Sequence, residues 1–174
     1  KASENVKEQL GVSIWKEPDS HTLKKINTLA VPTVDSTEAF NNAMLALTKA
    51  LADTLDGKQL RKLSGIVDDK IGSIQLAISF FQSQRADTSP FEYLKYVQGF
   101  RSGGGAAHRP NGKGDASKRL RRLLGDCTST DWKERFVYVC NRLTDGFNSL
   151  AAWQIQDADS QGEKETSDGK TSDR

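Results

Sequence analysis

Residues 89–100, SPFEYLKYVQGF, indicate the fold class of this 174-residue chain. Ser89 at the cap, Pro90 at the first helical position and Glu92 closing a capping box predict the start of a helix. Apolar residues then recur at steps of three and predict its buried side: Phe91, Leu94, Val97 and Phe100. The sequence therefore predicts an amphipathic helix that leads directly into a glycine-rich segment.

Two amphipathic segments precede this helix. The first begins at residues 35–38, where Asp35 and Glu38 resemble a capping box and Ser36 is the alternative cap. Gly57 is expected to end it. The second segment, residues 58–84, is predicted as one helix, and the break at residues 56–57 predicts an antiparallel hairpin of the two.

Within residues 58–84, Gly65 and Gly72 interrupt the apolar stripe. Each glycine either weakens the helix by about 1 kcal/mol or allows a neighbouring helix to pack closely. The sequence leaves these two interpretations open.

Two further helices are expected after the glycine-rich segment. Asp115 caps a short basic helix that runs through Leu124 and stops at Gly125. Asp131 starts the last helix, which ends near Trp153. No internal repeat and no alternating strand pattern are present, so we predict an all-α, up-and-down bundle of about four to five helices.

Composition divides the chain into three parts. Residues 1–34 are expected to form an N-terminal arm or a linker from a preceding domain, residues 35–155 the helical bundle, and residues 156–174 a disordered polar tail. Because the sequence does not begin with Met, we expect it to be a piece of a longer protein whose other domains are partners of this one.

Hydropathy and cysteine usage favour a cytoplasmic protein. No apolar run reaches about 18 residues, and the N-terminus lacks a signal peptide, so no membrane partner is expected. Cys127 and Cys140 lack metal-ligand spacing. Reduced thiols are expected, with a structural disulfide as the alternative.

Positive charge gathers in one region although the net charge is only +2. Between residues 101 and 122, Asp115 is the single acid, whereas seven residues are basic: Arg101, Arg109, Lys113, Lys118, Arg119, Arg121 and Arg122. Such a patch is typical of proteins that bind a polyanion. The competing interpretation is a solvated helix face.

The segment between Arg101 and His108 combines the residue types that phosphodiester chemistry needs. Histidine exchanges protons near neutral pH, and arginine presents a planar cation that suits phosphate. The consecutive glycines 103–105 leave backbone N–H groups accessible to an anion. No metal cluster, Walker A loop or nucleophile triad is readable, so no metal and no cofactor are expected.

The stretch FRSGGGAAHR, residues 100–109, resembles the signature of HEPN domains, small helical bundles of prokaryotic antiviral defence and toxin–antitoxin systems. Their motif is an arginine followed, after about four to six residues, by a histidine. Six residues separate Arg101 from His108 here. The arrangement of helices around the motif is similar as well.

This resemblance implies a homodimer in which two motifs face each other, and a metal-independent endoribonuclease. Arg101 would stabilise the scissile phosphate and His108 would act as acid or base. RNA contacts would come from the basic patch together with Ser102, which stands where active members often carry Asn, Asp or His. Many members are non-catalytic, so a HEPN-like dimerisation or interaction module is one alternative. The other alternative is a simple nucleic-acid-binding helical domain that works through the basic patch.

Overall fold

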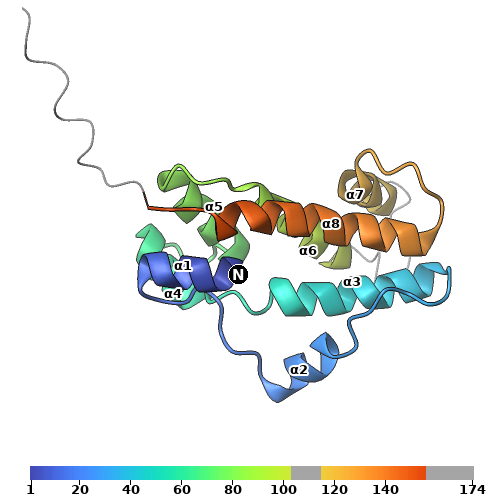
Figure 1. Cartoon of the computed structure of the whole chain (residues 1–174), viewed down its shortest axis with the longest axis horizontal. Helices are drawn as coiled ribbons and strands as arrows, with labels where there is room; N and C mark the ends of the chain where they lie inside the picture. The colour runs from blue at the N-terminus through green and yellow to red at the C-terminus, as the bar shows by residue number, and fades with distance from the viewer. Residues whose placement is uncertain (103–114, 156–174) are drawn as a thin grey trace, which may run out of the picture.

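The computed structural model describes residues 1–102 and 115–155, and these residues form eight helices and no strand (Figure 1). The all-α prediction is confirmed, and HEPN likeness remains a prediction. The helices are α1 (Ala2–Leu10), α2 (Ser20–Ile26), α3 (Thr37–Leu51), α4 (Gly57–Ser64), α5 (Ser73–Ser83), α6 (Ser89–Ser102), α7 (Asp115–Leu124) and α8 (Trp132–Ala151).

Helix α6 lies at the centre of the bundle and contacts α3, α5, α7 and α8. Its two ends show that it runs antiparallel to α3 and α8. The ring centroid of Phe91 lies 5.9 Å from that of Phe147, near the end of α8. The ring centroid of Phe100 lies 5.8 Å from that of Phe40, at the start of α3. Helices α3 and α8 therefore run in the same direction on α6.

Two adjacent residues, Asp35 and Ser36, accept hydrogen bonds from backbone amides at the starts of two different helices, α8 and α3. The Ser36 hydroxyl accepts a hydrogen bond from the Ala39 amide at 3.1 Å, which makes Ser36 the cap of α3. Asp35 instead accepts from the Trp132 amide at 2.6 Å and satisfies the first N–H of α8. Asp131 caps the same helix as expected, accepting from the Lys133 amide at 2.7 Å.

The prediction of one helix over residues 58–84 is wrong. Helix α4 ends at Gly65, whose φ of 66° is left-handed, and α5 begins only after Gly72. Glycine adopts this conformation without the Cβ penalty of other residues, so it stops the helix instead of only weakening it. Val67, an apolar residue that a single helix over residues 58–84 would place on its buried stripe, is 91% exposed in the intervening loop.

The antiparallel hairpin predicted between the first two amphipathic segments does not form, and α4 pairs with α5 instead. Helix α3 ends at Leu51, and Asp56 accepts from the amides of Lys58 and Gln59, so Gly57 begins α4 instead of ending α3. Helix α4 pairs with α5, whereas α3 pairs with α2, α6 and α8.

The segment assigned from the sequence to an arm contributes to the core. Val6 on α1 and Ile14 are fully buried, and α1 packs against α8 (Figure 1). The side-chain amide of Asn5 donates to the backbone carbonyl groups of Leu150 at 2.9 Å and Trp153 at 2.7 Å, which satisfies acceptors at the end of α8. Residues 1–15 therefore pack as part of the same body.

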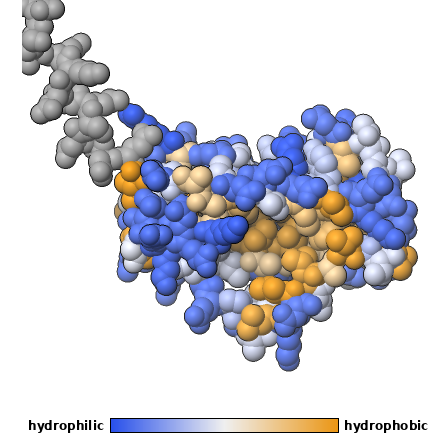
Figure 2. Space-filling model, viewed as in Figure 1, coloured by the Kyte–Doolittle hydropathy of each residue, from blue (hydrophilic) through white to orange (hydrophobic). Residues whose placement is uncertain are grey.

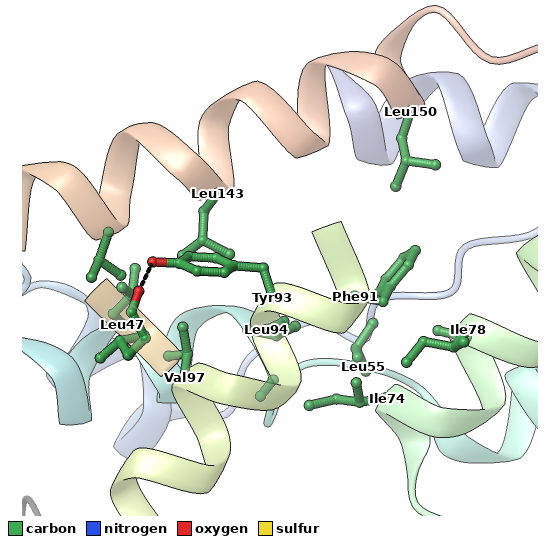
Figure 3. Close-up of a cluster of buried hydrophobic side chains, with 14 of the residues drawn as sticks. Leu47, Leu55, Ile74, Ile78, Phe91, Tyr93, Leu94, Val97, Leu143 and Leu150 are labelled. Atoms are coloured by element: carbon green, nitrogen blue, oxygen red, sulfur yellow. Dashed lines mark hydrogen bonds between the residues drawn. The ribbon is translucent and has the colours of Figure 1, made fainter. Parts of the chain in front are cut away.

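Buried side chains from α3, α5, α6 and α8 meet around α6 (Figure 3). Leu94 and Val97 are fully buried on one side of α6, and Tyr93 directs its hydroxyl toward α7. Leu123 and Leu124 of α7 enter this core, and Gly125, with a φ of 51°, ends that helix as predicted. No helix in the described ranges has both the length and the apolar character that crossing a membrane requires.

Candidate nucleic-acid interface

A basic groove lies between α6 and α7. Its volume is about 320 Å³, and its walls come from the second half of α6 and from one face of α7. The lining residues are Lys95, Tyr96, Gly99, Lys118, Arg119 and Arg122. Four of these described residues are cations and none of them is acidic, so the groove suits an anion in charge as well as in shape.

Two hydrogen bonds position α7 on α6. The Tyr93 hydroxyl donates to the Leu123 carbonyl at 2.6 Å (Figure 3), and Arg119 donates to the Gly99 carbonyl at 2.8 Å. Both acceptors belong to the last four residues of their helices, whose carbonyl groups have no partner within the helix. Each helix thus satisfies an acceptor of the other.

The electrostatic surroundings of Tyr93 keep its hydroxyl protonated. Burial raises the pKa of the Tyr93 phenol well above its ordinary value, with the Arg142 guanidinium acting in the opposite direction. Arg142 lies over the ring at 5.1 Å from its centroid. The phenol therefore acts as a donor to α7.

The basic residues of α7 are not equivalent. Lys118 and Arg122, one turn apart, are exposed and line the groove. Arg119 is half-buried and uses one of its donors on Gly99, so it has a structural contact as well as a place in the groove. Arg121 is exposed but does not line this groove.

Only the first two residues of the predicted catalytic motif fall within the described residues, two and three positions after the groove residue Gly99 on α6. Arg101 and Ser102 form the last residues of that helix. His108, Arg109 and Lys113 lie outside the described residues, as do the side chains of Arg101 and Ser102. The structure therefore brings together Lys118, Arg119 and Arg122 from the predicted set, and it leaves the pairing of Arg101 with His108 untested.

Two groove residues were missed by sequence reasoning. Lys95 and Tyr96 lie on α6, outside the basic cluster of residues 101–122. The signal available was their position on the polar side of that helix, because Leu94 and Val97 occupy the buried side. Their pairing with α7 depends on tertiary packing, which the sequence pattern does not specify.

A second groove, of about 350 Å³, continues the basic surface on the other side of Lys95. Lys70, Ser73, Gln75 and Gln98 line it together with Lys95. The Lys95 ammonium group donates to the Gln75 side-chain oxygen at 2.9 Å, which holds the cation between the two grooves. The polar surface therefore extends from α7 across α6 to the start of α5.

A separate pocket of about 500 Å³ has a different character. Trp15, Leu47, Leu51, Leu143 and Phe147 form its apolar walls. Figure 2 shows apolar residues gathered over the middle of the face that it views, where α3 and α8 lie in Figure 1. None of the described residues that line the pocket is charged, and burial raises the pKa of the Cys140 thiol in its lining. This described lining offers an anion no cation, so the basic groove is the better candidate for a phosphate site.

Among the described residues, no three His, Cys, Asp or Glu side chains are grouped to hold a metal ion, and Cys127 and Cys140 are free thiols. No family model, curated protein or solved structure matches this chain.

Proposed function

We propose that this domain binds RNA through the basic groove between α6 and α7. The observation that carries the proposal is the convergence of Lys95 with Lys118, Arg119 and Arg122 on one groove, where none of the described lining residues is acidic. Cations from two helices placed along one groove can each meet a phosphate of the same backbone. Neutralising phosphates releases condensed counterions, which makes the binding salt-dependent.

The experiment compares two double variants of equal charge change. Lys118→Ala/Arg122→Ala removes two exposed groove cations, and Lys24→Ala/Lys25→Ala removes two exposed cations of α2. Fluorescence anisotropy with a labelled RNA, measured from about 50 to 200 mM salt, gives affinity and salt dependence. The groove variant is expected to bind at least tenfold more weakly, with a log–log salt slope shallower by about 1.4.

The α2 variant controls for net charge. If both double variants weaken binding equally, the groove is not the site. If the wild-type chain binds no RNA even at low salt, the proposal fails altogether.

RNA cleavage is the finer part of the proposal, and it is supported by the resemblance of Arg101 and His108 to the HEPN motif. In this chemistry a histidine takes the proton of a ribose 2′-OH while that oxygen attacks the adjacent phosphorus. An arginine stabilises the charge that develops on the phosphoryl oxygens. The bond from phosphorus to the 5′-oxygen breaks as the new bond forms, and the leaving oxygen takes a proton from the solvent, so the products are a 2′,3′-cyclic phosphate and a free 5′-hydroxyl.

Labelled RNA incubated with EDTA and either wild-type protein or His108→Ala tests this part. Cleavage by the wild type alone, with a cyclic phosphate end, is expected. Equal cleavage by both proteins would leave binding as the function. Sedimentation of the wild type, at several concentrations, tests the homodimer that the resemblance implies.

A further inference from the structure

The side chain that distinguishes the basic groove from a simple patch of cations is Tyr96. It lines the groove among Lys95, Lys118 and Arg122, and 44% of it is exposed. An exposed aromatic ring between cations offers a ligand two kinds of contact. The cations meet phosphates, and the ring meets a flat, apolar surface.

The Tyr96 ring is supported from within the domain. It packs edge-on against Tyr93, with ring centroids 6.4 Å apart and an interplanar angle of 89°. Tyr93 is itself fixed by its hydrogen bond to the Leu123 carbonyl. Because its neighbour is buried and hydrogen-bonded, the Tyr96 ring loses less conformational freedom on binding than an unsupported side chain.

We infer that the groove takes single-stranded RNA, with an unpaired base stacked on Tyr96 and the flanking phosphates on Lys95, Lys118 and Arg122. This inference rests on the proposed RNA binding and names its substrate class. Bases in a duplex are already stacked on one another, so their faces are not accessible to a side chain. A cation-lined groove with an exposed aromatic residue is the arrangement that recognises single strands without reading their sequence.

The second groove extends the path that a bound strand can follow. Lys95 lines both grooves, and Lys70 lies at the far one. A strand that crosses Lys95 therefore meets cations on both sides of α6. Its other end leaves along α7, next to the part of α6 that ends in Arg101 and Ser102.

The test is a double-mutant cycle between protein and RNA. The probes are a labelled 12-nucleotide single strand, the same strand with several abasic positions, and a blunt hairpin duplex of equal charge. The protein variants are Tyr96→Leu, which removes the ring, and Tyr96→Phe, which keeps it. Urea denaturation confirms that each variant is folded.

The wild type is expected to bind the intact strand about tenfold or more tightly than the abasic strand. Tyr96→Leu should lose that preference and keep the wild-type salt slope, because no charge is removed. Tyr96→Phe should bind within about twofold of the wild type, since the stacking surface remains. The hairpin should bind more weakly than the intact strand.

If the intact strand, the abasic strand and the hairpin bind equally, and Tyr96→Leu matches the wild type, the inference is overturned while RNA binding through the cations stands. If no probe binds the wild type, the inference and the proposed function both fail.

Discussion

The Tyr93 hydroxyl donates a hydrogen bond of 2.6 Å to the Leu123 carbonyl, and this buried contact fixes the end of α7 against α6. The two residues are 30 positions apart, on either side of the glycine-rich segment. The bond therefore holds the two walls of the basic groove in place whatever path the intervening chain takes. It gives a first prediction about stability.

Tyr93→Phe keeps the ring and removes only the donor. The Leu123 carbonyl is then left without its partner in a buried site, so the free energy of unfolding should fall by about 1–3 kcal/mol. Urea denaturation measures this loss. Tyr96→Phe is the matched control, because its ring is partly exposed, and it should change stability by less than about 0.5 kcal/mol. Equal effects of the two changes would contradict the structural role of the Tyr93 hydroxyl.

The sequence predicts those elements whose start and stop signals are local. Asp131 and Gly125 act as expected, because a cap and a left-handed stop involve only neighbouring residues. The choice between Asp35 and Ser36 as the cap of α3 stayed open, because the partner of Asp35, the Trp132 amide, is 97 positions away. The break between α4 and α5 was missed because apolar periodicity continues through Gly65, whose backbone conformation the pattern does not reveal.

The residues of the candidate site were likewise predicted only where they lie close together in the sequence. Lys118, Arg119 and Arg122 were found because they are close together in the sequence. Tyr96 and Lys95 join them only through the packing of α6 on α7, which long-range contacts such as that of Arg119 with Gly99 determine. The pattern also could not separate Arg121 from its neighbours, since helix periodicity gives the faces of α7 but not which face meets α6.

Asp87 provides a prediction about pH. Its carboxylate accepts hydrogen bonds from the Ser89 amide and the Ser149 hydroxyl, each at 2.8 Å, and so connects the start of α6 to α8. Its slight burial opposes ionisation, but the hydrogen bonds outweigh this effect and lower the pKa of Asp87. Because the folded pKa lies below the unfolded one, the stabilisation is complete above the unfolded value. It is lost as the pH falls through the folded value.

Asp87→Asn should therefore be less stable than the wild type near neutral pH, by about 0.5 kcal/mol because the site is exposed to solvent. The difference should shrink as the pH is lowered below about 4. Thermal unfolding at a series of pH values measures it. Ser149→Ala, which removes one of the donors, should show a smaller version of the same trend. A difference that stays constant down to pH 3 would exclude this assignment.

Two helical glycines give opposite expectations. A Cβ at Gly146 on α8 would lie 3.1 Å from the Cα and Cβ of Pro90, and this neighbour is too rigid to move aside. Overpacking costs about 1–3 kcal/mol, against a helix-propensity gain of about 1 kcal/mol. Gly146→Ala should thus lose about 1 kcal/mol overall. Gly99→Ala meets nothing within 4 Å and should gain about 0.5–1 kcal/mol. Stabilisation by both changes would show that α6 and α8 are not in close contact at Pro90.

Arg119 and Arg121 separate structural from electrostatic roles on α7. Arg119→Ala removes the donor to the Gly99 carbonyl, so we expect a loss of about 1–3 kcal/mol in unfolding free energy. We also expect weaker RNA binding, because α7 loses one of its contacts to α6. Arg121→Ala removes the same charge from an exposed position outside the groove and should change stability by less than about 0.5 kcal/mol.

Arg119→Lys keeps the charge but not the planar fork, so it should retain RNA affinity better than stability. Urea denaturation and RNA anisotropy on the same samples measure both quantities. Equal losses for Arg119→Ala and Arg121→Ala in both measurements would mean that α7 acts only as a charged surface.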